Sequence, residues 1–221
     1  MQKFGTPAPI STILDIPAGR VRFIAADRAD TTVEILPADA SNGRDVKAAE
    51  QTKVEYGDGV LRIEAAASNR ILGSSGSIEV TVQLPAGSGV VAKAVSGEFR
   101  TVGRLGDIAV ESSQASIKLD EAASARLTTL AGDVSVGRLG GAAEIRTGKG
   151  DIRIAEAVRG TVLLRTEVGA ISVDAAAGVS ASLDAGTSYG RIRNALKNTD
   201  GAAELNLQAT TAYGDITARS R

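Results

Sequence analysis

The residues of this chain best suited to chemistry are aspartates that recur at one position of a repeated phrase. In each copy the aspartate follows a glycine and precedes a β-branched residue; the copies are Asp107, Asp133, Asp151 and Asp215. A ladder of carboxylates could protonate and attack a glycosidic bond. Ala170 and Arg191 interrupt this ladder, however, and 3 Tyr and no Trp are present to stack on sugar rings. The other interpretation is that these aspartates stabilise turns after corner glycines.

Two residue types that dominate enzyme and metal sites are missing. The chain has no histidine and no cysteine, which removes the commonest general base and most transition-metal sites. A calcium-binding β-roll repeats a glycine-rich nonapeptide, and only a fragment around Gly148-Lys149-Gly150-Asp151-Ile152 matches it. No glycine-rich loop ends in the Gly-Lys-Ser/Thr of a phosphate site. We therefore predict no catalytic residue, no cofactor-binding residue and no metal ligand, and expect that the protein is not an enzyme.

Arginines and threonines also share repeat positions. Arg146 and Arg165 are each followed by threonine, and they could line a basic groove for an acidic partner. The alternative is an exposed ladder with acidic residues nearby. The threonines Thr129, Thr147 and Thr166 are expected to form a hydrogen-bonded stack.

Two tyrosines, Tyr189 and Tyr213, each precede a corner glycine in the last copies of the repeat. We expect their rings to stack on each other while the hydroxyls stay in water. A contact with a ligand is the alternative.

The phrase that holds these residues is Leu-x-Thr-x-x-Gly-Asp-Ile-x-Val, and it recurs about every 18–24 residues in the C-terminal half, as stacked supersecondary units do. Its later copies run from Leu183 to Gly190 and from Leu207 to Gly214, and we interpret them as stretched by two residues. Stacked coils would align Val134, Ile152, Ile171, Ile192 and Ile216 in one internal ladder. Corners are expected at Gly97, Gly106, Gly132, Gly141, Gly150, Gly160, Gly169, Gly178, Gly190, Gly201 and Gly214.

Residues 1–90 have the alternation of conventional antiparallel strands. Turn sequences separate 13–16 from 21–24 at Pro17-Ala18-Gly19, and 52–56 from 60–64 at Gly57-Asp58-Gly59. Strands are also expected at 31–36 and 77–84. The best helix candidate is 45–51, which could instead belong to a mobile loop with Ser41-Asn42-Gly43.

Together these patterns predict an all-β fold. Residues 91–221 would form one continuous right-handed β-helix-like solenoid, and residues 1–90 an antiparallel β region that caps it. The alternative is a β-sandwich followed by a second β domain. Repetition of side-chain identity in register favours the solenoid.

Composition narrows the function classes. The chain carries 25 basic and 26 acidic residues among 221, and its most basic run, 138–165, is interpreted as a solvated face and not as the aromatic-rich basic stripe of a nucleic-acid binder. No stretch approaches the ~20 apolar residues of a membrane span, and the N-terminus lacks the pattern of a secretion signal. We therefore expect no nucleic-acid partner and a cytoplasmic location.

The strand at 77–84, closed by Pro85-Ala86-Gly87, and the phrases beginning at Gly106, Gly132 and Gly150 resemble a bacterial β-strand-repeat family known as "putative adhesins", whose function is uncharacterised. The resemblance covers roughly residues 10–218. It implies surface attachment, often behind a membrane anchor or signal, and it supplies no catalytic residues.

A rigid repeat surface without a catalytic constellation predicts a non-enzymatic scaffold or protein-interaction module, whose partner is an unidentified protein or a second copy of the chain. Three alternatives stay open: an adhesin-like surface-binding protein, a carbohydrate-active enzyme that uses the aspartate ladder, and a self-assembling filament former.

Overall fold

The structure is a computed structural model that describes residues 1–65, 76–198 and 202–221. It divides into two compact units, Met1–Ala115 and Ser116–Arg221, whereas the sequence predicted a boundary near residue 90. Most of the described residues form strands, and these residues include one helix, α1 (Gly43–Gln51). Asn42 caps this helix because its side chain accepts a hydrogen bond from the Arg44 N–H. No helix within these ranges is long and apolar enough to cross a membrane.

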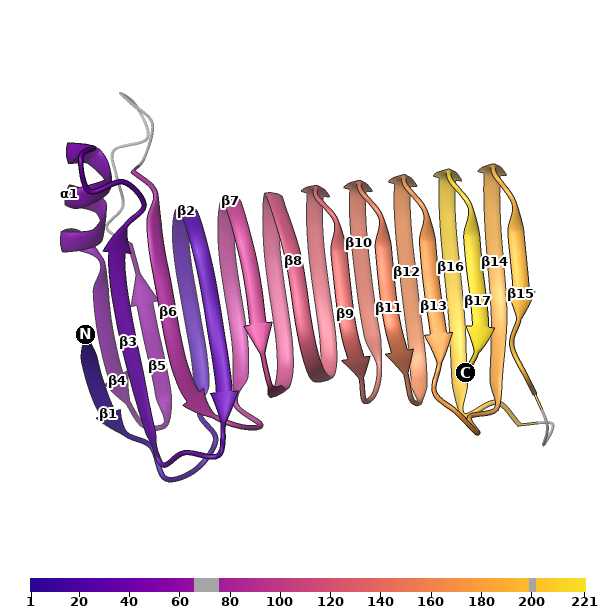
Figure 1. Cartoon of the computed structure of the whole chain (residues 1–221), viewed down its shortest axis with the longest axis horizontal. Coiled ribbons are helices and arrows are strands. Elements are labelled where there is room, and N and C mark those ends of the chain that lie inside the picture. The colour runs from indigo at the N-terminus through magenta and orange to yellow at the C-terminus, as the bar shows by residue number, and fades with distance from the viewer. Residues whose placement is uncertain (66–75, 199–201) are drawn as a thin grey trace. The chain divides into compact units, whose positions relative to one another are not determined.

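Unit 1 is built around two long strands that run parallel. Its strands are β1 (Gln2–Gly5), β2 (Ser11–Ala26), β3 (Asp30–Pro37), β4 (Lys53–Gly57), β5 (Val60–Glu64), β6 (Ile78–Pro85) and β7 (Gly89–Val102), followed by the start of β8 (Arg104–Ala131). β2 pairs with β7 from Ser11 opposite Gly89 to Ile24 opposite Val102, and the two lie side by side in Figure 1. The first half of β2 also pairs with β5, and its second half with β6.

The hairpin predicted around Pro17-Ala18-Gly19 is wrong, because residues 11–26 form the single strand β2. Gly19 has a φ of 153° and lies opposite Gly97, whose φ is 144°. Both glycines are therefore solenoid corners, at which the chain turns from one sheet into the next instead of reversing direction. Parallel stacking thus starts within residues 1–90, and the antiparallel pairs there are β1–β3, β3–β6 and β4–β5.

Other expectations for the first ninety residues are confirmed. The hairpin of β4 and β5 turns at Asp58 and Gly59, which have φ values of 51° and 74°, as such turns require. β6 forms where alternation predicted it. Phe23 of β2 and Phe99 of β7 fill the core of unit 1, with ring centroids 5.6 Å apart.

Unit 2 is a parallel, solenoid-like stack, as the repeat predicted. Its strands are the end of β8, then β9 (Val134–Leu139), β10 (Ala143–Lys149), β11 (Ile152–Ala157), β12 (Gly160–Val168), β13 (Ile171–Ala175), β14 (Ala181–Tyr189), β15 (Ile192–Ala195), β16 (Leu205–Tyr213) and β17 (Ile216–Ser220). One sheet has the order β8-β10-β12-β16-β14. The other has the order β8-β9-β11-β13-β17-β15. The right-handed winding stays a prediction.

The last two strands do not extend the stack but lie inside it. β16 pairs with both β12 and β14, and β17 pairs with both β13 and β15, so the yellow strands of Figure 1 lie between two orange layers. The predicted ladder therefore runs Val134, Ile152, Ile171, Ile216, Ile192, and its last member is 45% exposed. β16 buries Leu205, Leu207, Ala209 and Thr211 in strict alternation, whereas β15 is exposed along its whole length. The more apolar strands occupy the interior layer because more apolar surface is removed from water there.

The later repeats are not stretched. Thr166, Thr211 and Thr187 lie opposite one another, and Leu207 lies opposite Val162. The leucine has moved two residues along the same face, while the threonine and the corner glycine keep their places. Gly201, predicted to be a corner, lies outside the described residues.

Candidate functional site

The repeated aspartates connect neighbouring coils through backbone amides. Asp133 Oδ1 accepts a hydrogen bond from the Asp151 N–H at 2.9 Å, and Asp151 Oδ1 accepts one from the Ala170 N–H at 2.7 Å. Asp215 accepts from the Arg191 N–H at 2.9 Å and from its guanidinium at 3.0 Å, and these two bonds lower the pKa of the Asp215 carboxyl. Asp107 lies in unit 1, on β8. The aspartates of unit 2 therefore stabilise turns, although the turn that each one caps belongs to the next coil.

Two of the three threonines predicted to stack, Thr147 and Thr166, bond to the same corners, whereas the Thr129 hydroxyl donates to the Ala131 carbonyl at 3.0 Å. The hydroxyls of Thr147 and Thr166 donate to the carbonyls of Gly132 and Gly150, at 3.1 and 3.0 Å. Thr211 and Thr187 donate likewise to Gly169 and Gly214. The predicted threonine stack is therefore wrong in its partners. In two coils with the full Thr-x-x-Gly-Asp spacing, at Thr147–Asp151 and Thr211–Asp215, the hydroxyl and the carboxylate both bind the backbone of a neighbouring coil.

Arg146 and Arg165 lie directly opposite each other on β10 and β12, as their shared column predicted. Arg146 forms an ion pair with Glu144 of its own strand, and Glu144 lies 3.6 Å from Arg126. This arrangement agrees with an exposed charge ladder.

Tyr189 and Tyr213 stack as predicted, with ring centroids 4.8 Å apart and planes 4° from parallel. They remain 67% and 55% exposed. Among the described residues, no three His, Cys, Asp or Glu side chains are grouped as a metal would require.

A buried carboxylate holds the inserted strand β17 in place. Asp174 on β13 is 5% exposed and receives two hydrogen bonds from the Arg219 guanidinium, at 2.8 and 2.9 Å. These bonds lower the pKa of the Asp174 carboxyl despite its burial. Arg221 lies 3.7 Å from the same carboxylate and 3.3 Å from Glu156.

The substitution Asp174→Asn is expected to destabilise unit 2 by about 1–2 kcal/mol, less than for a fully buried pair because water screens Arg219. Since the folded-state pKa is depressed, the pair's contribution is complete above the unfolded pKa of about 3.9 and disappears as pH falls through the folded value. Urea titrations at pH 7 and pH 3 should therefore show the variant's deficit shrinking in acid. The exposed Asp184→Asn is the control, and an equal deficit at both pH values would contradict the ionic explanation.

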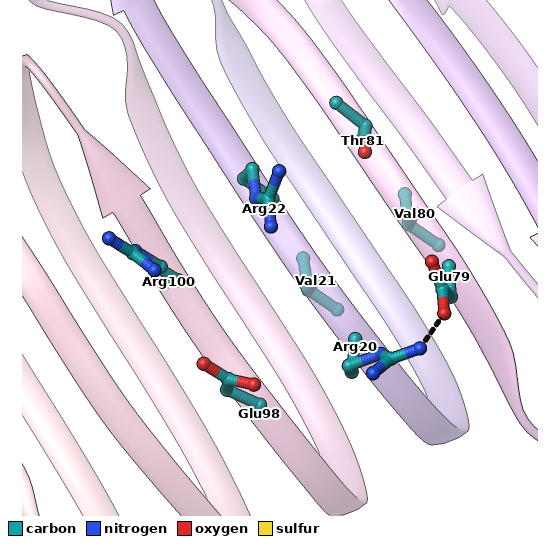
Figure 2. A pocket seen from close by; sticks show the side chains of 8 residues that line it. All are labelled: Arg20, Val21, Arg22, Glu79, Val80, Thr81, Glu98 and Arg100. Atoms are coloured by element: carbon teal, nitrogen blue, oxygen red, sulfur yellow. Dashed lines mark hydrogen bonds and ion pairs between the residues drawn. The ribbon is translucent and has the colours of Figure 1, made fainter. Parts of the chain in front are cut away.

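Unit 1 contains a hollow lined by arginines, which the sequence analysis did not single out. It is an open depression of about 360 Å³ on the outer face of β6, β2 and β7, and Figure 2 shows its charged side chains. Two rows of residues cross these strands. Arg20 lies between Glu79 and Glu98, and it forms an ion pair with Glu79. In the next row, Arg22 lies between Thr81 and Arg100.

Register explains why this site was missed. Arg22 and Arg100 are far apart in sequence, and the expected hairpin hid the parallel pairing of β2 with β7. A signal was present: Gly19 and Gly97 are each followed three residues later by an arginine. Recognising Gly19 as a corner would have placed the two arginines side by side.

Comparisons with known proteins agree with this architecture. The sequence profile of a family described as "Toastrack DUF4097" matches residues 14–220. A "putative adhesin" from Parabacteroides distasonis ATCC 8503 is similar in structure, with a TM-score of 0.53, 13% identity, and coverage of 98% of this chain and 95% of that one. A "putative adhesin" from Bacteroides fragilis NCTC 9343 has a TM-score of 0.51, 14% identity and the same coverage, 98% and 95%. At such identities the likeness concerns the fold alone. No curated protein matches the sequence.

Proposed function

The chain belongs to the Toastrack DUF4097 family, and we propose that it is a non-enzymatic interaction module that presents the outer surface of a β-solenoid to a protein partner. One observation carries this proposal: the repeat carboxylates best placed for chemistry, Asp133 and Asp151, accept backbone amides between coils. A carboxylate that must hold a turn together is poorly suited to proton transfer, which needs an open approach to substrate.

Similar folds give the proposal indirect support. The two similar structures, from Parabacteroides distasonis and Bacteroides fragilis, are each described as a "putative adhesin". Adhesion is a binding role. A binding role for the same scaffold in this chain is inferred by analogy of fold. An adhesin-like variant of the proposal differs only in where the partner lies, on another cell or surface.

The proposal is tested by separating binding from turnover. We expect the purified chain to release no sugar from a panel of polysaccharides. We also expect that a partner captured by crosslinking in native lysate will bind the chain again once that partner has been purified. The double variant Asp133→Asn/Asp151→Asn should keep that binding provided that circular dichroism shows it folded. Sugar release by the wild type that is lost in the folded double variant would favour the carbohydrate-active enzyme instead.

Self-association is a second candidate, favoured by one edge of unit 2. Within the described ranges, β14 and β15 pair on one side only, with β16 and β17. Unpaired strand edges of this kind can accept a strand from another chain. Size-exclusion chromatography with light scattering, across a hundredfold range of concentration, should then show a mass that climbs. A constant monomer mass would eliminate the filament former and leave the separate partner.

The cytoplasmic location stays a prediction from the sequence. Fractionation of the native cells, followed by immunoblotting, tests it. Recovery in the surface fraction would favour the adhesin-like variant.

A further inference from the structure

We propose that the hollow on β6, β2 and β7 is a binding site for an extended protein segment that carries a carboxylate and, two residues away, a basic side chain. This inference rests on the proposed interaction role and names the surface and the chemistry of the partner.

The hollow contains a pair of like charges on neighbouring strands. Arg22 and Arg100 are exposed and lie directly opposite each other on neighbouring parallel strands, whose backbones are about 4.8 Å apart. Neither guanidinium has an ion-pair partner in the ranges that the structure describes. Along this row Glu34 lies opposite Thr81, two strands from Arg22, and Glu98 lies one step away in the neighbouring row. Like charges placed directly opposite each other destabilise a sheet, and an anion bound between them would reverse the sign of this contribution.

The donors suit a carboxylate. Each guanidinium offers a planar set of N–H donors that matches a carboxylate in a bidentate arrangement. The Thr81 hydroxyl, on the other side of Arg22, supplies one more donor. The hollow has a volume of about 360 Å³, which is room for side chains of an incoming segment. Val21 and Val80 contribute to its lining, which contains no aromatic ring on which a sugar could stack.

The neighbouring row defines the rest of the segment. Glu79 and Glu98 flank Arg20 there, which leaves this row with an excess of negative charge. Alternate residues of a strand lie about 6.7 Å apart on one face, so the acidic row is one such step from Arg22 and Arg100. An extended segment with a carboxylate over the arginines would place its residue two positions away over Glu98. A basic side chain fits at that point, whereas an evenly charged polyanion would be repelled.

The test uses the full chain and a defined probe, the peptide acetyl-Ser-Glu-Ser-Lys-Ser-amide. Binding is followed by NMR through the arginine Nε–Hε signals at low ionic strength, where screening is weak. We expect a Kd of about 1 mM or tighter, with shifts concentrated at Arg22 and Arg100. The Glu→Gln version of the peptide should lose those shifts, and the Lys→Glu version should bind several-fold more weakly.

Three protein variants separate the site from general electrostatics. Arg22→Gln and Arg100→Gln should each weaken binding at least about tenfold. Arg62→Gln removes the same charge from a site where Glu55 already lies opposite, and it should change affinity less than about twofold. Because Arg100→Gln relieves a like-charge contact, its Tm should equal or exceed that of the wild type, as expected for a group kept for binding.

Several results would overturn the inference. One is an equal loss of affinity in all three variants. Another is tighter binding of hexaglutamate or heparin at Arg22 and Arg100, which would assign the site to polyanions. A third is failure of the peptide to bind while the native protein partner still does, which would remove this site and leave the interaction role standing.

Discussion

Replacing Gly169 with alanine is expected to cost unit 2 about 4 kcal/mol or more of its stability, an unusually large effect for one methyl group. Gly169 has a φ of 154°, which L-residues with a side chain rarely adopt. A Cβ at this position would lie 2.0 Å from the carbonyl oxygen of Gly150 in the preceding coil. Backbone strain and a steric clash with backbone therefore act together.

The clash is a property of the whole column of corner glycines. A Cβ on Gly150 would lie 2.2 Å from the Gly132 carbonyl oxygen, and one on Gly214 would lie 1.9 Å from that of Gly169. Each of these carbonyls also accepts a threonine hydroxyl from the following coil. Moving the backbone to make room at one corner therefore breaks hydrogen bonds to the coils on either side. Relaxation of the stack would thus lower its stability as well.

Tyrosine fluorescence allows this prediction to be measured on unit 2 alone. The chain has no tryptophan and 3 tyrosines, and in a Tyr56→Phe background the remaining two, Tyr189 and Tyr213, both lie in unit 2. Urea titration in that background gives the midpoint and slope for each variant.

The matched control is Gly186→Ala. Gly186 lies on β14, where a Cβ would meet only the Thr210 methyl at 4.0 Å. This substitution should change stability by less than about 1 kcal/mol. Equal costs at Gly169 and Gly186 would show that the corners do not need glycine.

The sequence predicted the periodic features of unit 2 because each coil repeats the same local requirement. Val134, Ile152 and Ile171 fall in one column, since every coil must bury a side chain at that point. The corner glycines and the tyrosine stack follow from the same regularity. The order of the layers did not follow, because the repeat is equally compatible with either order of the last two coils. Burial decided between them, through the alternation of Leu205 and Leu207 in β16.

The arginine-lined hollow shows a different limit. A motif on one strand can be found by its local pattern, but a site formed across strands needs their register. Arg22 faces Arg100 only because β2 and β7 are parallel and their corner glycines, Gly19 and Gly97, lie opposite each other. Pro17 with Gly19 is also typical of a tight turn, and that interpretation placed the arginine in a hairpin. The conformation of Gly19 could not be distinguished from a turn by residue type.

The inserted position of β16 and β17 gives the second large prediction, a reversal of mutational costs between two isoleucines of one column. Ile216 is 1% exposed and lies between Ile171 and Ile192, whereas Ile192 is 45% exposed at the end of the column. Ile216→Ala should cost about 3–4 kcal/mol, since it removes buried methyl groups and leaves a cavity. Ile192→Ala should cost about 1 kcal/mol or less, because its side chain already contacts water.

The same tyrosine signal reports both variants, and the comparison is matched in residue type, column and substitution. If the coils stacked in the order of the sequence, Ile192 would be the interior residue and Ile216 the terminal one, and the two costs would exchange. A larger loss for Ile192→Ala would therefore contradict the inserted order. The expected order also has a consequence for folding. β14 and β15 pair with β16 and β17, which follow them in the sequence. The terminal layer therefore cannot form its strand pairing until β16 and β17 have folded beside β12 and β13.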